Sequence, residues 1–186
     1  GDSAKASLLK NKYGDFILFI GILEKYKGED YLVKAMLRNK LNLVIIGSGY
    51  NAEGIKQQII NLGLQNRVFL LGNIPHYDLK EYYDACRMFC LPSLMDVFPL
   101  VLLEAAASGK PMISTELGTG TSYINIDKET GYVIEPGSVE QLSNAINRFL
   151  SEEKLTEQMG ANAKRRVMDK FGVHQVINSL IDLYSN

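Results

Sequence analysis

A short segment in the middle of the chain has the residue types and spacing to hold an anion. Pro99 suits the first turn of a helix, because that turn needs no proline N–H and the ring already fixes a helical φ. A helix that begins near Phe98 leaves the amides of Leu100 and Val101 without intrahelical acceptors, at the positive end of the helix dipole. The segment therefore predicts a phosphate-binding site formed by these two amides, which we call the cradle.

Two carboxylates flank this predicted helix start. Asp96 lies in the loop before it, and Glu104 lies more than one turn into the helix. Ionised carboxylates only accept hydrogen bonds, so beside a phosphate group their natural partners are hydroxyl groups. A helix cap is the alternative for Asp96, since helix N-termini favour acids. Glu104 is harder to explain structurally, because an unpaired carboxylate among apolar residues is costly.

The elements that must position these groups alternate along the chain. Helical spacing predicts helices over Tyr31–Arg38, Glu53–Leu62 and Leu79–Ala85. The short apolar segments between them indicate strands buried on both faces. These segments are Phe16–Ile20, Leu43–Ile46, Val68–Leu70, Met88–Leu91, Met112–Ser114 and Tyr132–Ile134. The alternation predicts an α/β fold, a Rossmann-like three-layer sandwich with a mostly parallel sheet of about six strands.

In such a sheet ligands bind at the carboxyl ends of the strands, so the loops that follow the strands matter most. These loops are Gly21–Gly28, Gly47–Asn51, Gly72–Tyr77, Pro92–Phe98 and Thr115–Gly120. The predicted cradle follows the fourth of them. The Gly47-Ser48-Gly49 loop resembles a dinucleotide fingerprint only superficially, because it lacks the third glycine and a downstream acid that would bind ribose.

We expect different structures at the two ends of the chain. Residues 1–14 are polar and are expected to be a residual interdomain connection, with one domain over residues 15–186. Beyond Gly137 we expect helices on one side of the sheet, with breaks at Gly160 and Gly172. Those helices are predicted over Val139–Leu150, Leu155–Lys170 and Val173–Tyr184.

Composition excludes several classes of protein. With 46% hydrophobic residues the 186-residue chain can bury one sizeable core. Its net charge of −1 produces no overall electrostatic field that would attract nucleic acid. The apolar runs fall short of the roughly 18 to 20 residues that span a bilayer. The first 14 residues lack the order of a signal peptide, so a cytoplasmic location is expected. The basic run Lys164-Arg165-Arg166 is interpreted as a solvated face, with a membrane-surface patch as the alternative.

The two cysteines favour buried thiols. Cys86 and Cys90 stand four residues apart without a second cysteine pair or a nearby histidine cluster, which leaves a zinc site short of ligands. A redox or metal role is the alternative. We expect no metal and no cofactor.

The carboxylate pair is also the centre of a wider resemblance. Asp96 and Glu104, with seven residues between them in a Pro-Ser…Phe-x-Leu-x-Leu-x-Glu-Ala setting, resemble the signature of retaining GT-B glycosyltransferases of family 4. Five other short motifs, some before and some after this pair, occur along the chain in the order typical of that family, so the resemblance covers nearly the whole chain. They are Gly21…Lys27-Gly28, Ile46-Gly47-Ser48-Gly49, Leu71-Gly72-Asn73-Ile74, Ser108-Gly109-Lys110-Pro111 and Gly131-Tyr132-Val133.

The resemblance implies a role for each matching residue. Asp96 would contact the hydroxyls of the donor sugar, Glu104 those of the ribose, and Lys27 would neutralise the diphosphate and the leaving group. These three are the implied catalytic residues. The remaining nucleotide-sugar contacts would come from Ser48, Ile74, His76, Phe98, Pro99, Leu100 and Val101.

The chain departs from the family pattern at three positions. Ile22 stands where an arginine is usual, Asp96 replaces a glutamate, and Pro99 replaces a glycine. A charge-assisted hydrogen bond contributes roughly 1.5 to 3 kcal/mol, so the missing arginine would weaken nucleotide binding unless Lys25 substitutes for it.

The resemblance implies the donor-binding C-terminal domain of a metal-independent, retaining hexosyltransferase. The donor is expected to be GDP-mannose first and a UDP-hexose second, since residues 114–123 look similar to bacterial mannose-transferring members. The acceptor would be a glycan or a lipid-linked glycan in surface polysaccharide or glycolipid synthesis, held through an N-terminal domain that this chain lacks, and peripheral membrane contact would accompany a lipid acceptor. We expect nucleotide binding without turnover by this incomplete chain. A non-catalytic binding module and a GT-B sugar-nucleotide 2-epimerase are the alternatives.

Overall fold

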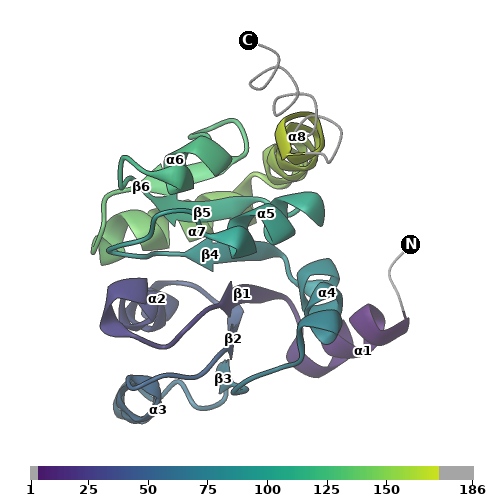
Figure 1. The fold of residues 1–186 in the computed structure, drawn as a ribbon. Coiled ribbons are helices and arrows are strands. Elements are labelled where there is room, and N and C mark those ends of the chain that lie inside the picture. The colour runs from purple at the N-terminus through teal and green to yellow at the C-terminus, as the bar shows by residue number, and fades with distance from the viewer. Residues whose placement is uncertain (1–3, 172–186) are drawn as a thin grey trace.

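A computed structural model describes residues 4–171 of the chain. The centre of the molecule is a parallel sheet (Figure 1). Its strand order is β3-β2-β1-β4-β5-β6, and every neighbouring pair is parallel. The strands are β1 (Phe16–Ile20), β2 (Asn42–Ile46), β3 (Val68–Leu70), β4 (Met88–Leu91), β5 (Met112–Thr115) and β6 (Gly131–Ile134). The predicted α/β fold and each of the six predicted strands are therefore confirmed.

Helices cover both faces of the sheet, which makes three layers (Figure 1). One face carries α2 (Glu29–Ala35), α3 (Ala52–Asn61) and α7 (Val139–Ser151). The other face carries α1 (Ala4–Tyr13), α4 (His76–Ala85), α5 (Leu100–Ala107) and α8 (Glu153–Phe171). The short helix α6 (Gly120–Ile124) follows β5, and two 3-10 turns cover Lys25–Lys27 and Met36–Arg38.

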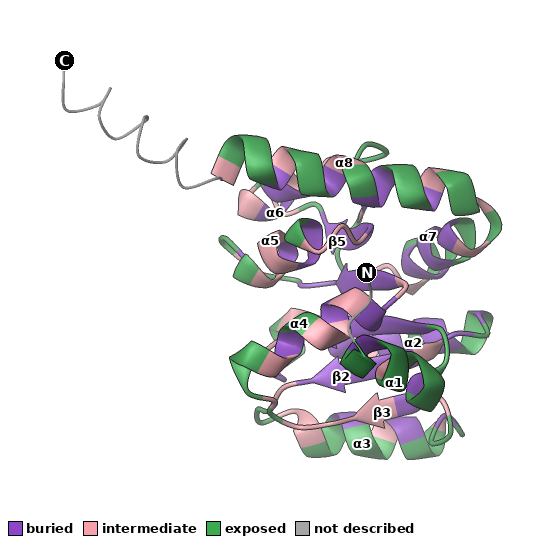
Figure 2. Cartoon of the chain, turned by 90° about the vertical axis from the view of Figure 1, so that its right-hand side faces the viewer, coloured by how far each residue is buried: buried purple, intermediate pink, exposed green. Residues whose placement is uncertain are grey.

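The core lies between these layers because the strands are apolar on both faces. All residues of β1 and β4 are buried, including Phe16, Phe19 and Phe89. Figure 2 shows the buried strands enclosed by helices whose outer faces are exposed. Continuous runs of Ile, Val, Leu and Phe are what a parallel sheet covered on both sides requires. The apolar segments therefore fix the sheet, and the sheet positions the loops at its edges.

The C-terminal helices do not lie on one side of the sheet, so that expectation was wrong. Helix α7 packs beside α2, whereas α8 packs against α5 on the opposite face. Gly160 does not break α8 either: it lies inside the helix, where a Cβ would stand 3.2 Å from the carbonyl carbon of Gly109 and closer still to its oxygen. Gly160 therefore serves close packing. Val173–Tyr184 and Gly172 lie outside the described residues.

The N-terminal segment contains a helix that packs onto the domain. Helix α1 lies against α4, and its residues Ala6 and Tyr13 are buried. The Tyr13 ring contacts Phe16 and Phe69, with centroids 5.9 and 5.0 Å away. A role for residues 1–14 as an interdomain connection stays a prediction.

The basic run on α8 is only partly a solvated face. Arg166 donates hydrogen bonds to the carbonyl oxygen of Tyr123, and its guanidinium lies 5.3 Å from the centre of the Tyr123 ring. It therefore ties α8 to the end of α6, whereas Lys164 and Arg165 are exposed. Within residues 4–171 no helix combines the length and the apolar character needed to cross a membrane.

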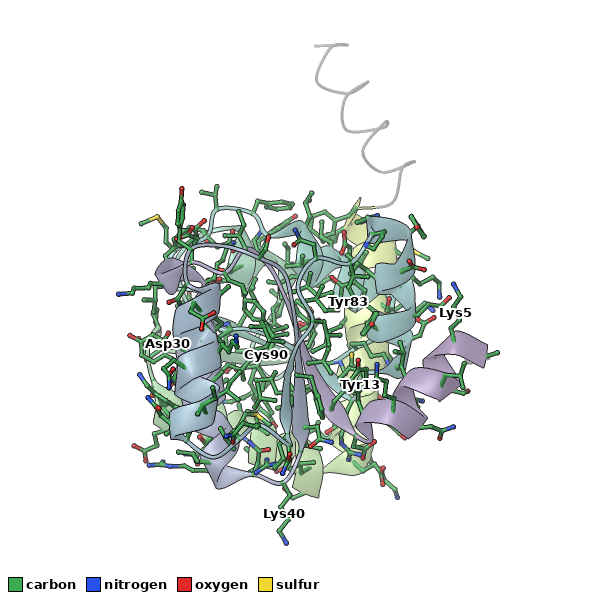
Figure 3. All side chains as sticks on the ribbon, turned by 90° about the horizontal axis from the view of Figure 1, so that it is seen from below. Lys5, Tyr13, Asp30, Lys40, Tyr83 and Cys90 are labelled. Carbon is green, nitrogen blue, oxygen red and sulfur yellow. The ribbon has the colours of Figure 1, made fainter. Side chains whose placement is uncertain are left out.

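The two cysteines are buried free thiols, as predicted. Burial raises the pKa of Cys86 to about 12 and also raises the pKa of Cys90. Figure 3 shows Cys90 in the interior of the sheet, far from surface residues such as Lys5 and Lys40. Both thiols therefore contribute to packing.

Candidate functional site

The two middle strands of the sheet mark the place where a ligand can enter. β1 pairs with β2 on one side and with β4 on the other, so the strand order reverses between β1 and β4. In open parallel sheets the loops leave in opposite directions at such a point and open a crevice at the carboxyl ends of the strands. The loops after β1 and β4 border this crevice.

These two loops contact each other directly. Gly28 has φ 72° and approaches Pro92 so closely that a Cβ would stand 2.9 Å from the Pro92 carbonyl carbon and closer still to its oxygen. The amide of Leu94 donates to the carbonyl oxygen of Tyr26 at 2.7 Å. Only glycine combines this positive φ with this close approach. The loop after β1 is therefore fixed against the loop after β4.

The contact between the loops brings Lys27 and Asp96 together. Lys27 Nζ lies 2.7 Å from Asp96 Oδ2, with the two side chains 18% and 10% exposed. Ser93 Oγ donates to the same carboxylate at 3.4 Å, and Thr119 Oγ1 donates to the backbone oxygen of Asp96 at 2.8 Å. The start of α5 has no side-chain cap, so the interpretation of Asp96 as a helix cap was wrong.

Helix α5 begins at Leu100, two residues later than the sequence predicted. Pro99 is the N-cap, with φ −77° and ψ 106°, and its carbonyl accepts from the amide of Leu102 at 3.1 Å. A residue before proline is disfavoured in the helical region, which prevents a start at Phe98. The amide of Gly120 also holds the carbonyl of Val97 at 2.8 Å, which fixes the loop outside the helix.

The later start keeps the predicted cradle. Leu100 and Val101 are the first two helical residues, so their amides precede the first possible intrahelical acceptors. Leu100 is 63% exposed, and Val101 is half-buried. Two backbone donors at the positive end of α5 thus lie beside the loop that carries Asp96.

Glu104 and His76 form a second group of predicted residues. His76 Nε2 lies 3.0 Å from Glu104 Oε1, and the two side chains are 82% and 31% exposed. Tyr83 donates its hydroxyl to Glu104 Oε2 at 2.8 Å. Together with Leu79 these residues line a cavity of about 280 Å³ between α4 and α5. The cost of an unpaired Glu104 is avoided, since both carboxylate oxygens have partners.

Tyr83 was not among the residues singled out from the sequence. Leu79 and Tyr83 are four residues apart, which places them on one helix face, toward the core. A buried tyrosine needs a partner for its hydroxyl, and this requirement is the signal that sequence reasoning could have used. Thr119 had no comparable signal, because its partner is a backbone oxygen in a distant loop.

Ser48 and Ile74 come together in a third place. They line an apolar cavity of about 190 Å³ at the carboxyl ends of β1, β2 and β3, together with Ile22. Leu79 lines both this cavity and the one beside Glu104. The two cavities are therefore neighbours at one edge of the sheet.

Lys25 does not lie with these residues. It lines a separate cavity with Tyr31 and Asn51, next to α2 and α3. No described contact brings its ammonium group to the start of α5, which argues against Lys25 as the substitute for the missing arginine.

The arrangement can bind a ligand that is anionic in the middle and hydroxylated on both sides. Amides and Lys27 suit the anion, Asp96 and Glu104 accept from hydroxyls, and the cavity beside Ile74 suits a flat apolar group. The cradle residues come from one loop and one helix, so they are positioned by short-range geometry. The individual roles stay predictions.

Comparison with known proteins supports this description. The family model described as Glycosyl transferases group 1 matches residues 2–166. The O-antigen chain mannosyltransferase C of Escherichia coli is 34% identical over 187 residues, which covers 99% of this chain and 50% of the relative. The chain spans about half the length of the curated relatives it matches.

Two solved structures have the same fold. The Anabaena protein Alr3699/HepE, solved in complex with UDP, superposes with a TM-score of 0.91 at 22% identity, over 100% of this chain and 53% of that one. The C-terminal domain of the group 1 family protein LpcC from Francisella tularensis superposes with a TM-score of 0.83 at 24% identity, over 93% of this chain and 95% of that one. The chain therefore belongs to the Glycosyl transferases group 1 family, and its fold is that of the C-terminal half of a GT-B glycosyltransferase.

Proposed function

We propose that this chain binds the donor of a retaining, metal-independent glycosyltransferase that moves a hexose from a sugar nucleotide to a glycan or lipid-linked acceptor. The observation that carries the proposal is the start of α5, where two backbone amides adjoin the Lys27–Asp96 pair. The diphosphate lies on the amides of Leu100 and Val101. The ribose lies toward Glu104 and the base toward Ile74.

The same residues stabilise the leaving group. During transfer the bond between the anomeric carbon and the diphosphate oxygen breaks, and a bond to the acceptor oxygen forms on the same face of the sugar. Negative charge develops on the departing nucleoside diphosphate, whose leaving oxygen, on that same face of the sugar, accepts the proton that the acceptor hydroxyl loses. Helix-end amides and the ammonium of Lys27 stabilise that charge from fixed positions. Asp96 accepts from hydroxyls of the hexose.

For the donor we propose GDP-mannose first and a UDP-hexose second. The mannosyltransferase of Escherichia coli among the relatives supports mannose. The UDP complex of the Anabaena protein supports the alternative base. In the complete enzyme a second domain binds the acceptor. The enzyme acts in the cytoplasm and, if the acceptor is lipid-linked, at the inner face of the membrane.

The test is calorimetric titration of the chain with GDP-mannose, GDP, a UDP-hexose and UDP, together with one paired substitution. Leu100→Pro removes a single cradle donor, and proline is tolerated at the first helical position after an extended residue such as Pro99. Leu100→Ala keeps the amide and serves as the control, since this side chain is largely exposed.

We expect Leu100→Pro to weaken diphosphate binding about tenfold, as the loss of one charge-assisted hydrogen bond requires, with Leu100→Ala unchanged. Equal affinities for the two variants would rule out the cradle. Tight binding of UDP compounds alone would reverse the order of the donors.

A binding module without turnover is the second candidate, and Ile22 favours it. This residue is exposed at the mouth of the cavity beside Ile74, where the family usually has an arginine. Sugar transfer by the complete protein, measured with and without Ile22→Arg, separates the two. Transfer by the unmodified protein contradicts the second candidate.

A further inference from the structure

Tyr83 is a buried residue whose polar end reaches the candidate site. Its side chain lies between α4 and the sheet (Figure 3), only 2% of the residue is exposed, and its ring packs against Phe89 with centroids 5.6 Å apart. The hydroxyl lies 2.8 Å from Glu104 Oε2 and 3.4 Å from the carbonyl oxygen of Val101. The ring is thus fixed by packing while the oxygen meets the carboxylate.

The two oxygens of Glu104 have partners of different kinds. Tyr83 holds Oε2 from the buried side, whereas His76 reaches Oε1 from an exposed position. Burial, and then the neighbouring Glu104 carboxylate, raise the pKa of Tyr83 far above its usual value, so the phenol stays a donor. A ligand can displace the exposed His76 ring but not the packed Tyr83 ring.

We propose that Tyr83 is a positioning residue that holds Glu104 with Oε1 turned toward the ribose hydroxyls of the donor. This inference rests on the proposed function, because it presumes that a ribonucleotide binds beside Glu104. Without the phenol, the carboxylate could rotate about its side-chain torsions, and the ligand would have to immobilise it. Tyr83 would then act through Glu104 without touching the nucleotide.

The test compares two ligands that differ only at the ribose. The chain is titrated with UDP or GDP, whichever binds more tightly, and with the matching 2′,3′-dideoxynucleoside diphosphate. The variant is Tyr83→Phe, which removes one oxygen and keeps the ring against Phe89. The control is Tyr132→Phe, because the buried Tyr132 hydroxyl has no hydrogen-bond partner among the described residues.

We expect Tyr83→Phe to weaken binding of the ribonucleotide about tenfold and to leave that of the dideoxynucleotide within about twofold. The dideoxynucleotide also reports whether the variant is folded. The preference for ribose should collapse in Glu104→Ala as well, and adding Tyr83→Phe to that variant should change nothing further. Tyr132→Phe should keep the full preference.

Two results overturn the inference. One is an unchanged ribose preference in Tyr83→Phe, and the other is an equal loss for both ligands, which would indicate a purely structural role. Failure of the unmodified chain to bind any ribonucleoside diphosphate is a different result, because it refutes the proposed function itself.

Discussion

Replacement of Gly28 by alanine should disturb the contact between the two loops that carry Lys27 and Asp96. A Cβ on residue 28 would stand 2.9 Å from the carbonyl carbon of Pro92, whereas carbon atoms pack at about 3.5 to 4.0 Å. The loops must therefore part by roughly 1 Å. The positive φ of 72° adds strain of about 1 to 2 kcal/mol for any residue with a Cβ.

The chain offers a matched control for this strain. Gly63 has φ 67°, and a Cβ there would meet nothing within 4 Å. Gly63→Ala should therefore cost only the backbone strain, about 1 to 2 kcal/mol. Gly28→Ala should cost a further 1 to 3 kcal/mol or so for the overlap, about 2 to 5 kcal/mol in all.

Urea denaturation of the two variants measures the difference. At about 2 to 4 °C per kcal/mol for a chain of this size, thermal unfolding gives a second readout. Because Lys27 precedes Gly28, nucleoside diphosphate affinity should also fall in Gly28→Ala and stay unchanged in Gly63→Ala. Equal unfolding free energies for the two variants would refute the reasoning, whatever the ligand results are.

Two further predictions concern charge. Lys27→Met should weaken nucleoside diphosphate binding about ten- to hundredfold in calorimetry. Lys25→Met should leave the affinity unchanged, because the Lys25 side chain lines a different cavity. Similar losses for both variants would contradict the placement of the diphosphate beside Lys27. Since burial raises the pKa of Cys86 from 9.0 to about 12, the unfolded thiol ionises first, and stability should fall as pH rises from about 9 to about 12. Between pH 8 and 10.5 the free energy of unfolding, measured by urea denaturation, should decrease by roughly 1 to 2 kcal/mol less in Cys86→Ala than in the unmodified chain. An equal decrease in both would show that the Cys86 thiol is not its cause.

The sheet was predictable because its signal is local. The strands β1, β2 and β4 are short, largely apolar and buried, and such runs can be recognised without knowing which strands are their neighbours. Helix α1 was missed for the opposite reason, since only Ala6 and Tyr13 are buried and the remaining residues give no helical apolar stripe. The start of α5 was misplaced because Pro99 can serve either as a helix's first residue or, as here, just before it.

The site was predictable only in part. The cradle amides follow from a few consecutive residues, whereas the Lys27–Asp96 pair joins positions 69 residues apart. Such a contact depends on which strands are neighbours, and residue spacing alone does not determine that order. The family resemblance placed both residues in one site, but it did not predict that they would pair with each other.

The central position of β1 also determines when the site can exist during synthesis of the chain. β1 is made first among the strands, yet one of its two neighbours in the sheet is β4, which ends at Leu91. Until β4 and the residues after it have left the ribosome, Lys27 has no Asp96 to meet and α5 offers no amides. A nascent chain that stops just before Leu100 therefore contains four of the six strands and none of the proposed diphosphate cradle.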